Sequence, residues 1–434
     1  MIVEMITTGE EVLSGQITDT NATWISQQFV DIGITPSRRT TVGDRLEDLV
    51  SCFQERSKHA DVIIVNGGLG PTSDDMSARA AALAADQPLV QFQEWVDALE
   101  RKFADLARDM PASNLKQAML PQHAEIINNP VGTACGFVMK LNRALLFFTP
   151  GVPHEMKRMM TAEIMPHIAK KMHITVSSVL KRLHCFGISE ARLGAMLDRL
   201  DLPETVKLGY RAHIPTIEIK VMATGPNPEL LQIHKEEAAQ AVRQTIGDHL
   251  CFEDGHSMAT NIQRLMIEQG FTLATAESCT GGMTLSQLVD VPGSSAYVDR
   301  GFITYTNRAK HEMLGVPEEL ISQHGAVSLQ VARAMALGAR EKSRASFALS
   351  VSGVAGPGGG SPEKPVGTVA FSMAGPDQTW SQLIHVPQWG RTAIRNISSA
   401  IMLDMLRRCL EGQPVFGNYD YARRVAQLEE HRPV

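Results

Sequence analysis

Blocks of apolar and polar residues alternate through the first part of the chain. Residues 1–7 form a short strand-like run, and residues 61–66 form a continuous apolar run typical of a strand buried on both faces of a parallel sheet. Residues 144–148 form another strand-like run, and helical spacing separates these runs, as at residues 21–29. Strands alternating with helices predict a doubly wound α/β/α domain over residues 1–168.

A smaller mixed pattern follows this domain. Residues 174–186 and 216–223 are strand-like, whereas residues 189–200 and 228–246 have the spacing of helices. This order predicts a small α+β connecting domain over residues 172–252.

The last part of the chain repeats the α/β pattern. An apolar stretch ends near Ala274 and gives way to helical spacing near Met283, and a second apolar run leads to a strand at Val369. We therefore expect a C-terminal α/β domain over residues 256–412. Gln413 and Pro414 interrupt the last helix, so we expect residues 413–434 to be a disordered tail or an accessory helix without a role.

The composition is that of a globular protein. The 434 residues are 44% hydrophobic and 20% charged, and this length suits about two to three domains. The net charge of −6 includes no basic block, so no nucleic-acid partner is expected. Without a leader pattern or an apolar run of about 18 residues, we expect a cytoplasmic protein with no membrane partner. Six cysteines without CxxC spacing indicate reduced thiols.

A candidate nucleophile lies between a predicted strand and a predicted helix. Ser278 belongs to the string AESCTGG at residues 276–282. A serine on such a turn can expose its hydroxyl, and the next helical turn offers N–H groups and a positive dipole end to an anion. The same string also describes an ordinary capped helix start, and by itself it favours capping.

Two further strings add chemistry. Residues 351–368, VSGVAGPGGGSPEKPVGT, form a glycine-rich loop whose length is typical of functional or disordered segments. Its glycines let backbone amides approach a ligand, and its prolines stiffen the chain. Residues 301–310, GFITYTNRAK, supply the phenol of Tyr305 and the amine of Lys310.

Amide hydrolysis through a serine ester requires a base, donors for the oxyanion and an acid for the leaving ammonia. None of the three strings contains a histidine. Lys310 can be the base only if its pKa falls from about 10.4 toward 7–8. Tyr305 could relay the proton by hydrogen bonding to both Ser278 and Lys310. Alternatively, Lys310 is a solvated helix charge, and Cys279 is either the nucleophile or a small buried residue.

Together the three strings resemble the C-terminal domain of the CinA family, the nicotinamide mononucleotide deamidases, over residues 258–410. The resemblance implies hydrolysis of the carboxamide to nicotinate mononucleotide and ammonia, without a metal or organic cofactor. It implies catalytic roles for Ser278, Tyr305 and Lys310. The substrate-binding residues that it implies are Thr280, Gly281, Gly282, Ser352, Gly353, Gly356 and Arg391. Ser352 stands where the family usually has threonine, and Gly390 replaces the aspartate that usually precedes Arg391.

The apolar run at residues 61–66 leads into GGLGPTSDD, residues 67–75. A strand, a glycine turn and a helix with acidic residues near its start form a common site for phosphate or metal. Asp74 and Asp75 could instead only favour the helix N-terminus, by about 0.3–1 kcal/mol each.

This string and PGVPHEM, residues 150–156, resemble the molybdopterin-binding-like domain at the N-terminus of full-length CinA proteins. The resemblance covers residues 1–165 and implies ADP-ribose hydrolysis with a divalent metal ion. Asp74, Asp75 and Glu155 are the metal-binding residues that we expect. The alternative is a non-catalytic module that binds a pterin or nucleotide. The connecting domain resembles its counterpart in the same proteins, and the family pattern favours a homodimer.

Overall fold

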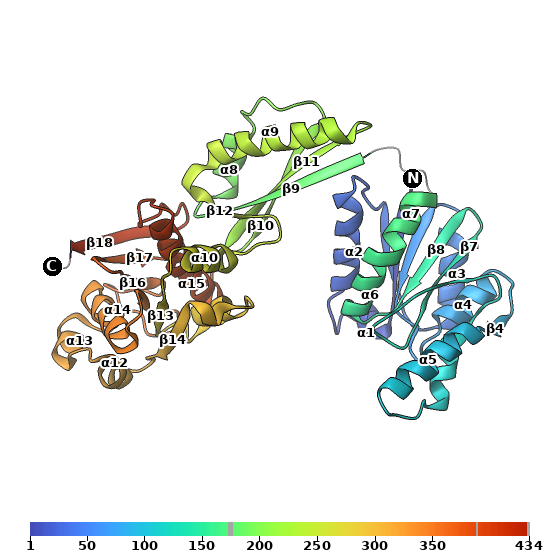
Figure 1. Ribbon diagram of the computed structural model, residues 1–434, viewed down its shortest axis with the longest axis horizontal. Coiled ribbons are helices and arrows are strands. Elements are labelled where there is room, and N and C mark those ends of the chain that lie inside the picture. Colours follow the sequence, from blue (N-terminus) through green and yellow to red (C-terminus); the bar gives the residue numbers. More distant parts are fainter. Residues whose placement is uncertain (172–176, 388, 432–434) are drawn as a thin grey trace. The chain divides into compact units, whose positions relative to one another are not determined.

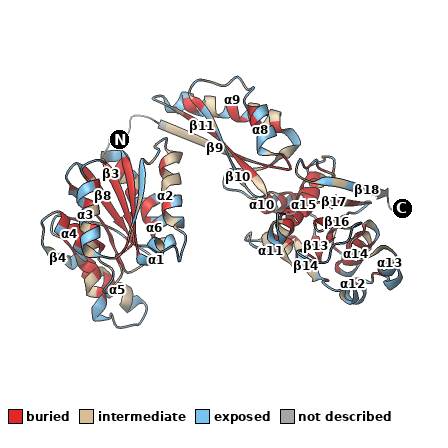
Figure 2. Ribbon diagram, turned by 180° about the vertical axis from the view of Figure 1, so that it is seen from behind, coloured by how far each residue is buried: buried red, intermediate tan, exposed pale blue. Residues whose placement is uncertain are grey.

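The structure is a computed structural model that describes residues 1–171, 177–387 and 389–431. The chain forms two compact units, of which the first contains residues 1–179 and 224–231 and the second residues 180–223 and 232–434 (Figure 1). The second unit therefore includes most of the predicted connecting domain. Buried residues are concentrated in the strands (Figure 2), and the predicted mixed α/β class is confirmed.

The first unit is built on a six-stranded sheet in the order β2-β1-β3-β8-β7-β6. Its strands are β1 (Val3–Thr8), β2 (Arg38–Val42), β3 (Val62–Asn66), β6 (Glu125–Ile127), β7 (Gly136–Leu141) and β8 (Ala144–Thr149). The first four in this order are parallel, whereas β7 is antiparallel to both of its neighbours, β8 and β6. The carboxyl ends of β1, β3 and β8 consequently lie side by side.

Helices cover both faces of this sheet because successive strand residues point to opposite sides. Val62 and Ile64 belong to the core formed with α2 (Thr20–Asp31), α6 (Pro153–Met159) and α7 (Met165–Lys171). Ile63 and Val65 belong to the core formed with α3 (Leu46–Arg56), α4 (Ser77–Ala84) and α5 (Gln93–Asp105). Shorter elements are α1 (Glu10–Leu13), β4 (Leu89–Gln91), η1 (Ala112–Ala118), β5 (Met119–Pro121) and η2 (Met160–Ile164).

A four-stranded sheet in the order β10-β11-β9-β12 corresponds to the predicted connecting domain. Its elements are β9 (Ser177–Phe186), α8 (Glu190–Leu197), β10 (Val206–His213), β11 (Thr216–Gly225), α9 (Pro228–Ile246), η3 (Gly247–His249) and β12 (Leu250–Glu253). The helix expected at residues 228–246 has the predicted bounds. Residues 174–176 of the strand expected at residues 174–186 lie outside the described residues. β10 and β12 were not predicted.

The remaining sheet has six strands in the order β14-β13-β15-β16-β17-β18. They are β13 (Leu273–Glu277), β14 (Val298–Ile303), β15 (Phe347–Gly353), β16 (Thr368–Ala374), β17 (Gln378–His385) and β18 (Arg423–His431). β13 is parallel to both neighbours, and the other pairs are antiparallel. One face packs on α10 (Met258–Glu268), α11 (Met283–Val289) and α15 (Arg391–Leu410), and the other on α12 (Asn307–Leu314), α13 (Glu318–His324) and α14 (Leu329–Ser343). The short helix η4 (Ser294–Ala296) precedes β14.

The segment after α15 belongs to this fold, so the expectation of a disordered tail or an accessory helix is wrong. β18 pairs with β17 and extends the sheet. Val415 and Tyr419 are buried in the core that α10 and α15 share. β18 has a mostly polar sequence, and its backbone pairing requires no apolar pattern that the sequence could reveal.

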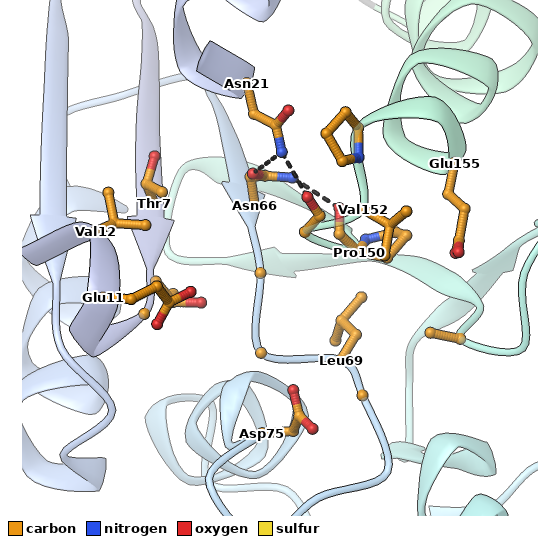
Figure 3. Close-up of a pocket in the computed structure, with 18 of the residues that line it drawn as sticks. Thr7, Glu11, Val12, Asn21, Asn66, Leu69, Asp75, Pro150, Val152 and Glu155 are labelled. Carbon is orange, nitrogen blue, oxygen red and sulfur yellow. Dashed lines mark hydrogen bonds between the residues drawn. The ribbon is translucent and has the colours of Figure 1, made fainter. Parts of the chain in front are cut away.

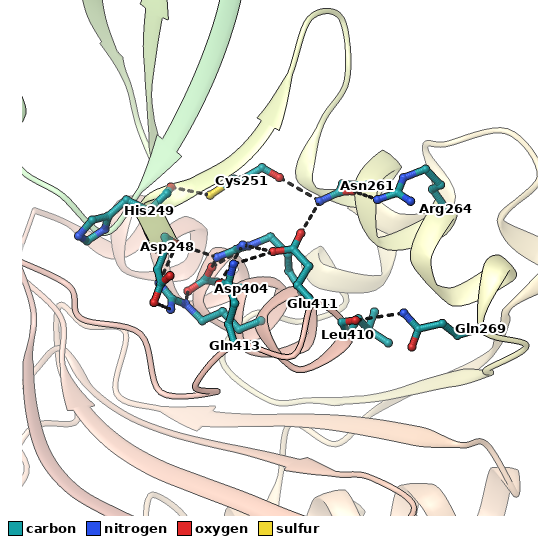
Figure 4. Close-up of polar contacts among 12 residues, drawn as sticks. Asp248, His249, Cys251, Asn261, Arg264, Gln269, Asp404, Leu410, Glu411 and Gln413 are labelled. Carbon is teal, nitrogen blue, oxygen red and sulfur yellow. Dashed lines mark hydrogen bonds and ion pairs between the residues drawn. The ribbon is translucent and has the colours of Figure 1, made fainter. Parts of the chain in front are cut away.

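Tyr419 also joins a buried charge cluster. Its hydroxyl donates to Asp404 Oδ2 at 3.0 Å, and the same carboxylate accepts from Arg407 Nη2 at 2.7 Å and Arg408 Nε at 2.8 Å. Both guanidinium groups also donate to the carbonyl of Asp248, at 3.1 and 3.0 Å (Figure 4). Burial and the nearby Asp404 raise the pKa of Tyr419, so its hydroxyl remains a donor. The cluster ties α15 to η3.

In the described part of the chain, no helix is long and apolar enough to cross a membrane.

The Tyr419→Phe substitution should destabilise the second unit. It removes a buried hydrogen bond to a charged acceptor, which contributes about 1–3 kcal/mol. Thermal unfolding followed by near-ultraviolet circular dichroism would detect the lower midpoint. Tyr210→Phe is a suitable control because Tyr210 is 38% exposed. Equal midpoints for Tyr419→Phe and the unsubstituted protein would contradict the prediction.

Candidate active site

Ser278 lies at the carboxyl end of β13, the strand flanked by two parallel neighbours. Its N–H donates to the carbonyl of Val351 at 3.0 Å and continues the pairing of β13 with β15 beyond the strand. Only 7% of the residue is exposed. The loop start is therefore fixed by the sheet, and the hydroxyl of Ser278 is sheltered from solvent.

Lys310 on α12 points its amine at this hydroxyl. Nζ donates to Ser278 Oγ at 3.1 Å and to the carbonyl of Thr304 at 3.0 Å, and the lysine is 1% exposed. Burial lowers the pKa of Lys310 below its usual value, because desolvation disfavours the ammonium form. The alternative of a solvated helix charge is therefore wrong. The Thr304 N–H donates to the carbonyl of Glu277 at 2.8 Å, which ties the start of this segment to β13.

The carboxylate of Glu277 occupies the N-terminus of α11. It is fully buried and accepts hydrogen bonds from the N–H groups of Gly282, Thr284 and Leu285, at 3.0, 3.1 and 2.9 Å. Gly281 and Gly282 have φ angles of +62° and +93°, a region that favours glycine, and they allow the chain to turn back over Glu277. These N–H groups are therefore not free to bind an anion, contrary to the expectation for this helix start.

Cys279 is a buried thiol in the same loop. Burial raises its pKa to about 12, so the thiol stays protonated near neutral pH and is a weak nucleophile. A Cβ added to Gly353 would lie 3.1 Å from Cys279 Sγ and 2.9 Å from Val369 Cγ2. The interpretation of Cys279 as a small buried residue is confirmed, and Gly353 provides the space that it needs.

Tyr305 lies apart from the serine–lysine pair. It is 59% exposed, and its hydroxyl accepts a hydrogen bond from Arg391 Nη2 at 3.0 Å. Within the described residues it makes no hydrogen bond to Ser278 or Lys310, so the arrangement required for a proton relay is not present. Arg391 Nη1 also donates to the carbonyl of Gly356 at 2.7 Å. Arg391 thus links α15 both to the glycine-rich loop and to Tyr305.

The remaining predicted residues lie in or around residues 278–282, the loop that carries the candidate nucleophile Ser278 and that we call the nucleophile loop. Ser352 is buried near the end of β15, next to the strand that carries Ser278. Thr280 is fully buried, and its carbonyl accepts a hydrogen bond from Arg395 Nη2 at 2.7 Å. Lys364 anchors the glycine-rich loop by donating to the carbonyl of His324 at 2.6 Å. Glu277 and Arg395 were not identified from the sequence. The four-residue spacing of Arg391 and Arg395, which puts both on one helix face, could have indicated Arg395.

A second candidate site is a cavity of about 490 Å³ in the first unit, at the carboxyl ends of β1, β3 and β8. Asn21 Nδ2 donates to Asn66 Oδ1 at 3.0 Å and to the carbonyl of Gly151 at 2.7 Å (Figure 3). Asn66 in turn donates to the carbonyl of Pro150 at 2.8 Å. Among the described residues, the buried hydroxyl of Thr8 beside this cavity has no hydrogen-bond partner.

The predicted metal-binding residues line this cavity without forming one cluster. Asp75 accepts hydrogen bonds from the backbone and hydroxyl of Thr72, whereas Glu155 accepts from Asn129 Nδ2 at 2.7 Å. No group of three or more histidine, cysteine, aspartate or glutamate residues in the described ranges is arranged to hold a metal ion. Helix α4 begins at Ser77, so Asp74 and Asp75 precede it and lie outside its first turn.

The cavity is nevertheless strongly acidic. Its lining includes the carboxylates Glu11, Asp19, Asp44, Asp74, Asp75 and Glu155. Burial and the neighbouring Glu11 and Asp74 raise the pKa of Asp44 above its usual value. Figure 3 shows Glu11, Asp75 and Glu155 at separate positions around the cavity.

Fold and site together define a protein with two α/β parts, one with an acidic cavity and one with a buried serine–lysine pair. Residues 4–170 match the family described as a probable molybdopterin binding domain, and residues 255–410 match the CinA C-terminal domain. A CinA-like protein of Shewanella denitrificans is 48% identical over 427 residues, which cover 98% of this chain and 100% of the relative. The chain belongs to the CinA family.

Two other proteins are also similar. The nicotinamide-nucleotide amidohydrolase PncC of Shewanella oneidensis is 48% identical over 98% of this chain and 100% of its own length. The crystal structure of a competence/damage inducible protein of Agrobacterium tumefaciens is 45% identical, covers 35% of this chain and 96% of its own, and has a TM-score of 0.33.

Lys310 should titrate below 10.5, the usual value for a lysine. Below its own midpoint the amine is protonated and cannot accept a proton, and above it the amine is a neutral base. NMR spectroscopy of the protein with ¹³C-labelled lysine would measure this midpoint, and the spectrum of Lys310→Met would identify the resonance. A midpoint at or above 10.5 would contradict the burial argument.

Proposed function

We propose that the second unit hydrolyses the carboxamide of nicotinamide mononucleotide to nicotinate mononucleotide and ammonia. The observation that carries the proposal is the 3.1 Å hydrogen bond between Ser278 Oγ and the buried amine of Lys310. A neutral lysine amine is a suitable base for a serine hydroxyl. The full-length similarity to a relative named nicotinamide-nucleotide amidohydrolase supports this choice of substrate.

In the first half of the reaction, Lys310 Nζ accepts the Ser278 hydroxyl proton while Oγ attacks the carboxamide carbon. The C=O electron pair moves to the oxygen and a tetrahedral oxyanion forms. The oxyanion collapses, the carbon–nitrogen bond breaks, and the ammonium of Lys310 returns the proton to the leaving nitrogen as ammonia departs. An ester of Ser278 remains.

In the second half, water replaces ammonia. Lys310 takes one proton from the water as its oxygen attacks the ester carbon, and the bond to Ser278 Oγ then breaks. Oγ regains the proton from Lys310, and the product leaves as a carboxylic acid that releases its remaining proton to solvent and becomes a carboxylate. The transfers to and from Oγ and the leaving nitrogen all use the same amine, and the proposed deamidation includes no metal ion or organic cofactor.

The substrate-binding residues surround this pair in the proposal. Arg391 carries a positive charge at the exposed start of α15, and its contacts with Tyr305 and Gly356 hold it beside the glycine-rich loop. This position suits the nucleotide phosphate. In this proposal Tyr305 orients Arg391, and Lys310 alone is the base.

Ser278→Ala should abolish ammonia release from nicotinamide mononucleotide, because no attacking oxygen remains. Cys279→Ala should retain most of the activity, because the thiol is protonated and buried. A coupled ammonia assay would measure both variants, with and without a chelator.

Thermal unfolding would show that both variants are folded. Activity of Ser278→Ala together with inactivity of Cys279→Ala would transfer the role of nucleophile to Cys279. Loss of wild-type activity on chelation would overturn the metal-free mechanism.

We also propose that the cavity of the first unit binds a nucleotide or pterin, with ADP-ribose as the nucleotide to test first. The cavity lies at the carboxyl ends of parallel strands, which is where α/β domains commonly bind nucleotides, and this position supports the proposal. The carboxylates do not fit a metal-binding set, so no hydrolytic step through a metal is derived. The homodimer stays a prediction that light scattering would test.

Glu11→Gln should tighten ADP-ribose binding, because it removes one of the carboxylates that repel the pyrophosphate in this acidic cavity. Calorimetric titration with chelator present would measure the Kd, and a product assay with and without Mg²⁺ would detect turnover. Glu163→Gln is a matched control because Glu163 is exposed and does not line the cavity. An unchanged or higher Kd for Glu11→Gln would contradict binding of ADP-ribose at this cavity.

A further inference from the structure

Arg395 holds the loop that carries the candidate nucleophile. Its Nε donates to the carbonyl of Cys279 at 3.1 Å, and its Nη2 donates to the carbonyl of Thr280 at 2.7 Å. These carbonyls belong to the first two residues after Ser278. One planar guanidinium therefore fixes two consecutive peptide groups, which a single point charge cannot do with the same geometry.

Glu277 holds the same loop from its other end. Its buried carboxylate accepts the three N–H groups that open α11, so the chain on both sides of the turn has charged partners. The N–H of Gly281 closes the turn by donating to the carbonyl of Ser278 at 3.1 Å. Because a trans peptide directs its carbonyl and N–H oppositely, the peptides after Cys279 and Thr280 cannot turn over without losing the bonds to Arg395.

Arg391 and Arg395 lie one turn apart on α15 but make different contacts. Arg391 is exposed and reaches Tyr305 and the glycine-rich loop, whereas Arg395 is half-buried and reaches the nucleophile loop. The hydrogen bond between Ser278 and Lys310 depends on where that loop places Oγ. A displacement of about 1 Å at such a contact can lower a rate about 10²-fold.

We propose that Arg395 is a positioning residue that orients Ser278 toward Lys310 by holding the carbonyls of Cys279 and Thr280. For its substrate, this inference rests on the proposed deamidation. Arg395 acts on the loop in the free enzyme, so its removal impairs the chemical step more than substrate binding.

The first experiment compares Arg395→Ala with Arg340→Ala in the full chain. Arg340 is a matched control because its Nε also donates to a backbone carbonyl, that of Ser346, at 3.0 Å, which precedes β15 at the opposite end of the sheet from Ser278. Steady-state deamidation should show kcat reduced about 10²-fold for Arg395→Ala, with KM within about threefold of wild type. Arg340→Ala should retain the wild-type kcat.

Two further measurements distinguish a positioning role of Arg395 from a general contribution to the stability of the fold. Added guanidinium ion should restore part of the kcat of Arg395→Ala, and Arg395→Lys should have intermediate activity because an amine satisfies fewer carbonyls. A raised KM with unchanged kcat would show that Arg395 binds substrate, and this result would overturn the inference. Wild-type kinetics in Arg395→Ala would overturn it as well.

A fluorophosphonate probe tests the inference without the proposed substrate. Ser278 Oγ attacks the phosphorus, fluoride leaves, and Lys310 accepts the hydroxyl proton. Mass spectrometry should show slower labelling of Ser278 in Arg395→Ala and normal labelling in Arg340→Ala. A wild-type protein that is labelled but does not deamidate would refute the proposed function and leave the inference standing. Absence of wild-type labelling, or equal labelling in Arg395→Ala, would overturn the inference.

Discussion

The burial of the Lys310 amine is the constraint on which the second unit's chemistry depends. Among the buried basic residues that the structure describes, Arg407 and Lys310 have opposite surroundings. Arg407 lies beside the carboxylate of Asp404, and its charge is compensated. Lys310 has a hydroxyl and a carbonyl as its partners, and no described carboxylate forms an ion pair with it. Without an ion pair to stabilise its ammonium form, desolvation lowers the pKa of Lys310 and makes the neutral amine accessible.

The sheet explains why the site could be predicted from distant segments. Ser278 follows β13, Thr304 follows β14, and Ser352 is the penultimate residue of β15. The carboxyl ends of parallel strands lie at one edge of a sheet. The prediction of an α/β domain from the apolar runs therefore already implied that these segments meet. The roles proposed for Ser278 and Lys310 followed from residue chemistry and the family resemblance, whereas the burial of the lysine depends on the packing of α12 and could not be predicted.

Other features depend on contacts that no local pattern encodes. Tyr305 and Lys310 are five residues apart, yet one is exposed and the other buried, because Tyr305 precedes α12 whereas Lys310 lies on that helix and its amine reaches Ser278. Glu277 was not identified from the sequence, and its position as the acceptor at α11 arises from the two glycines that turn the chain back. Asp74 and Asp75 precede α4 because that helix begins later than the acidic pattern indicated.

The segment that joins α15 to β18 lies beyond the matched CinA C-terminal domain and yet belongs to the same fold. The matched C-terminal domain ends at residue 410, whereas the backbone pairing of β17 continues through residues 423–431. In the same segment, Asp420 accepts the N–H and hydroxyl of Ser189, at 2.9 and 3.1 Å, at the start of α8. A protein cut at the family boundary would thus expose the hydrogen-bonding edge of β17 to other chains. Engineering of this domain by fusion or exchange should therefore place its junctions by strand pairing and not by sequence similarity.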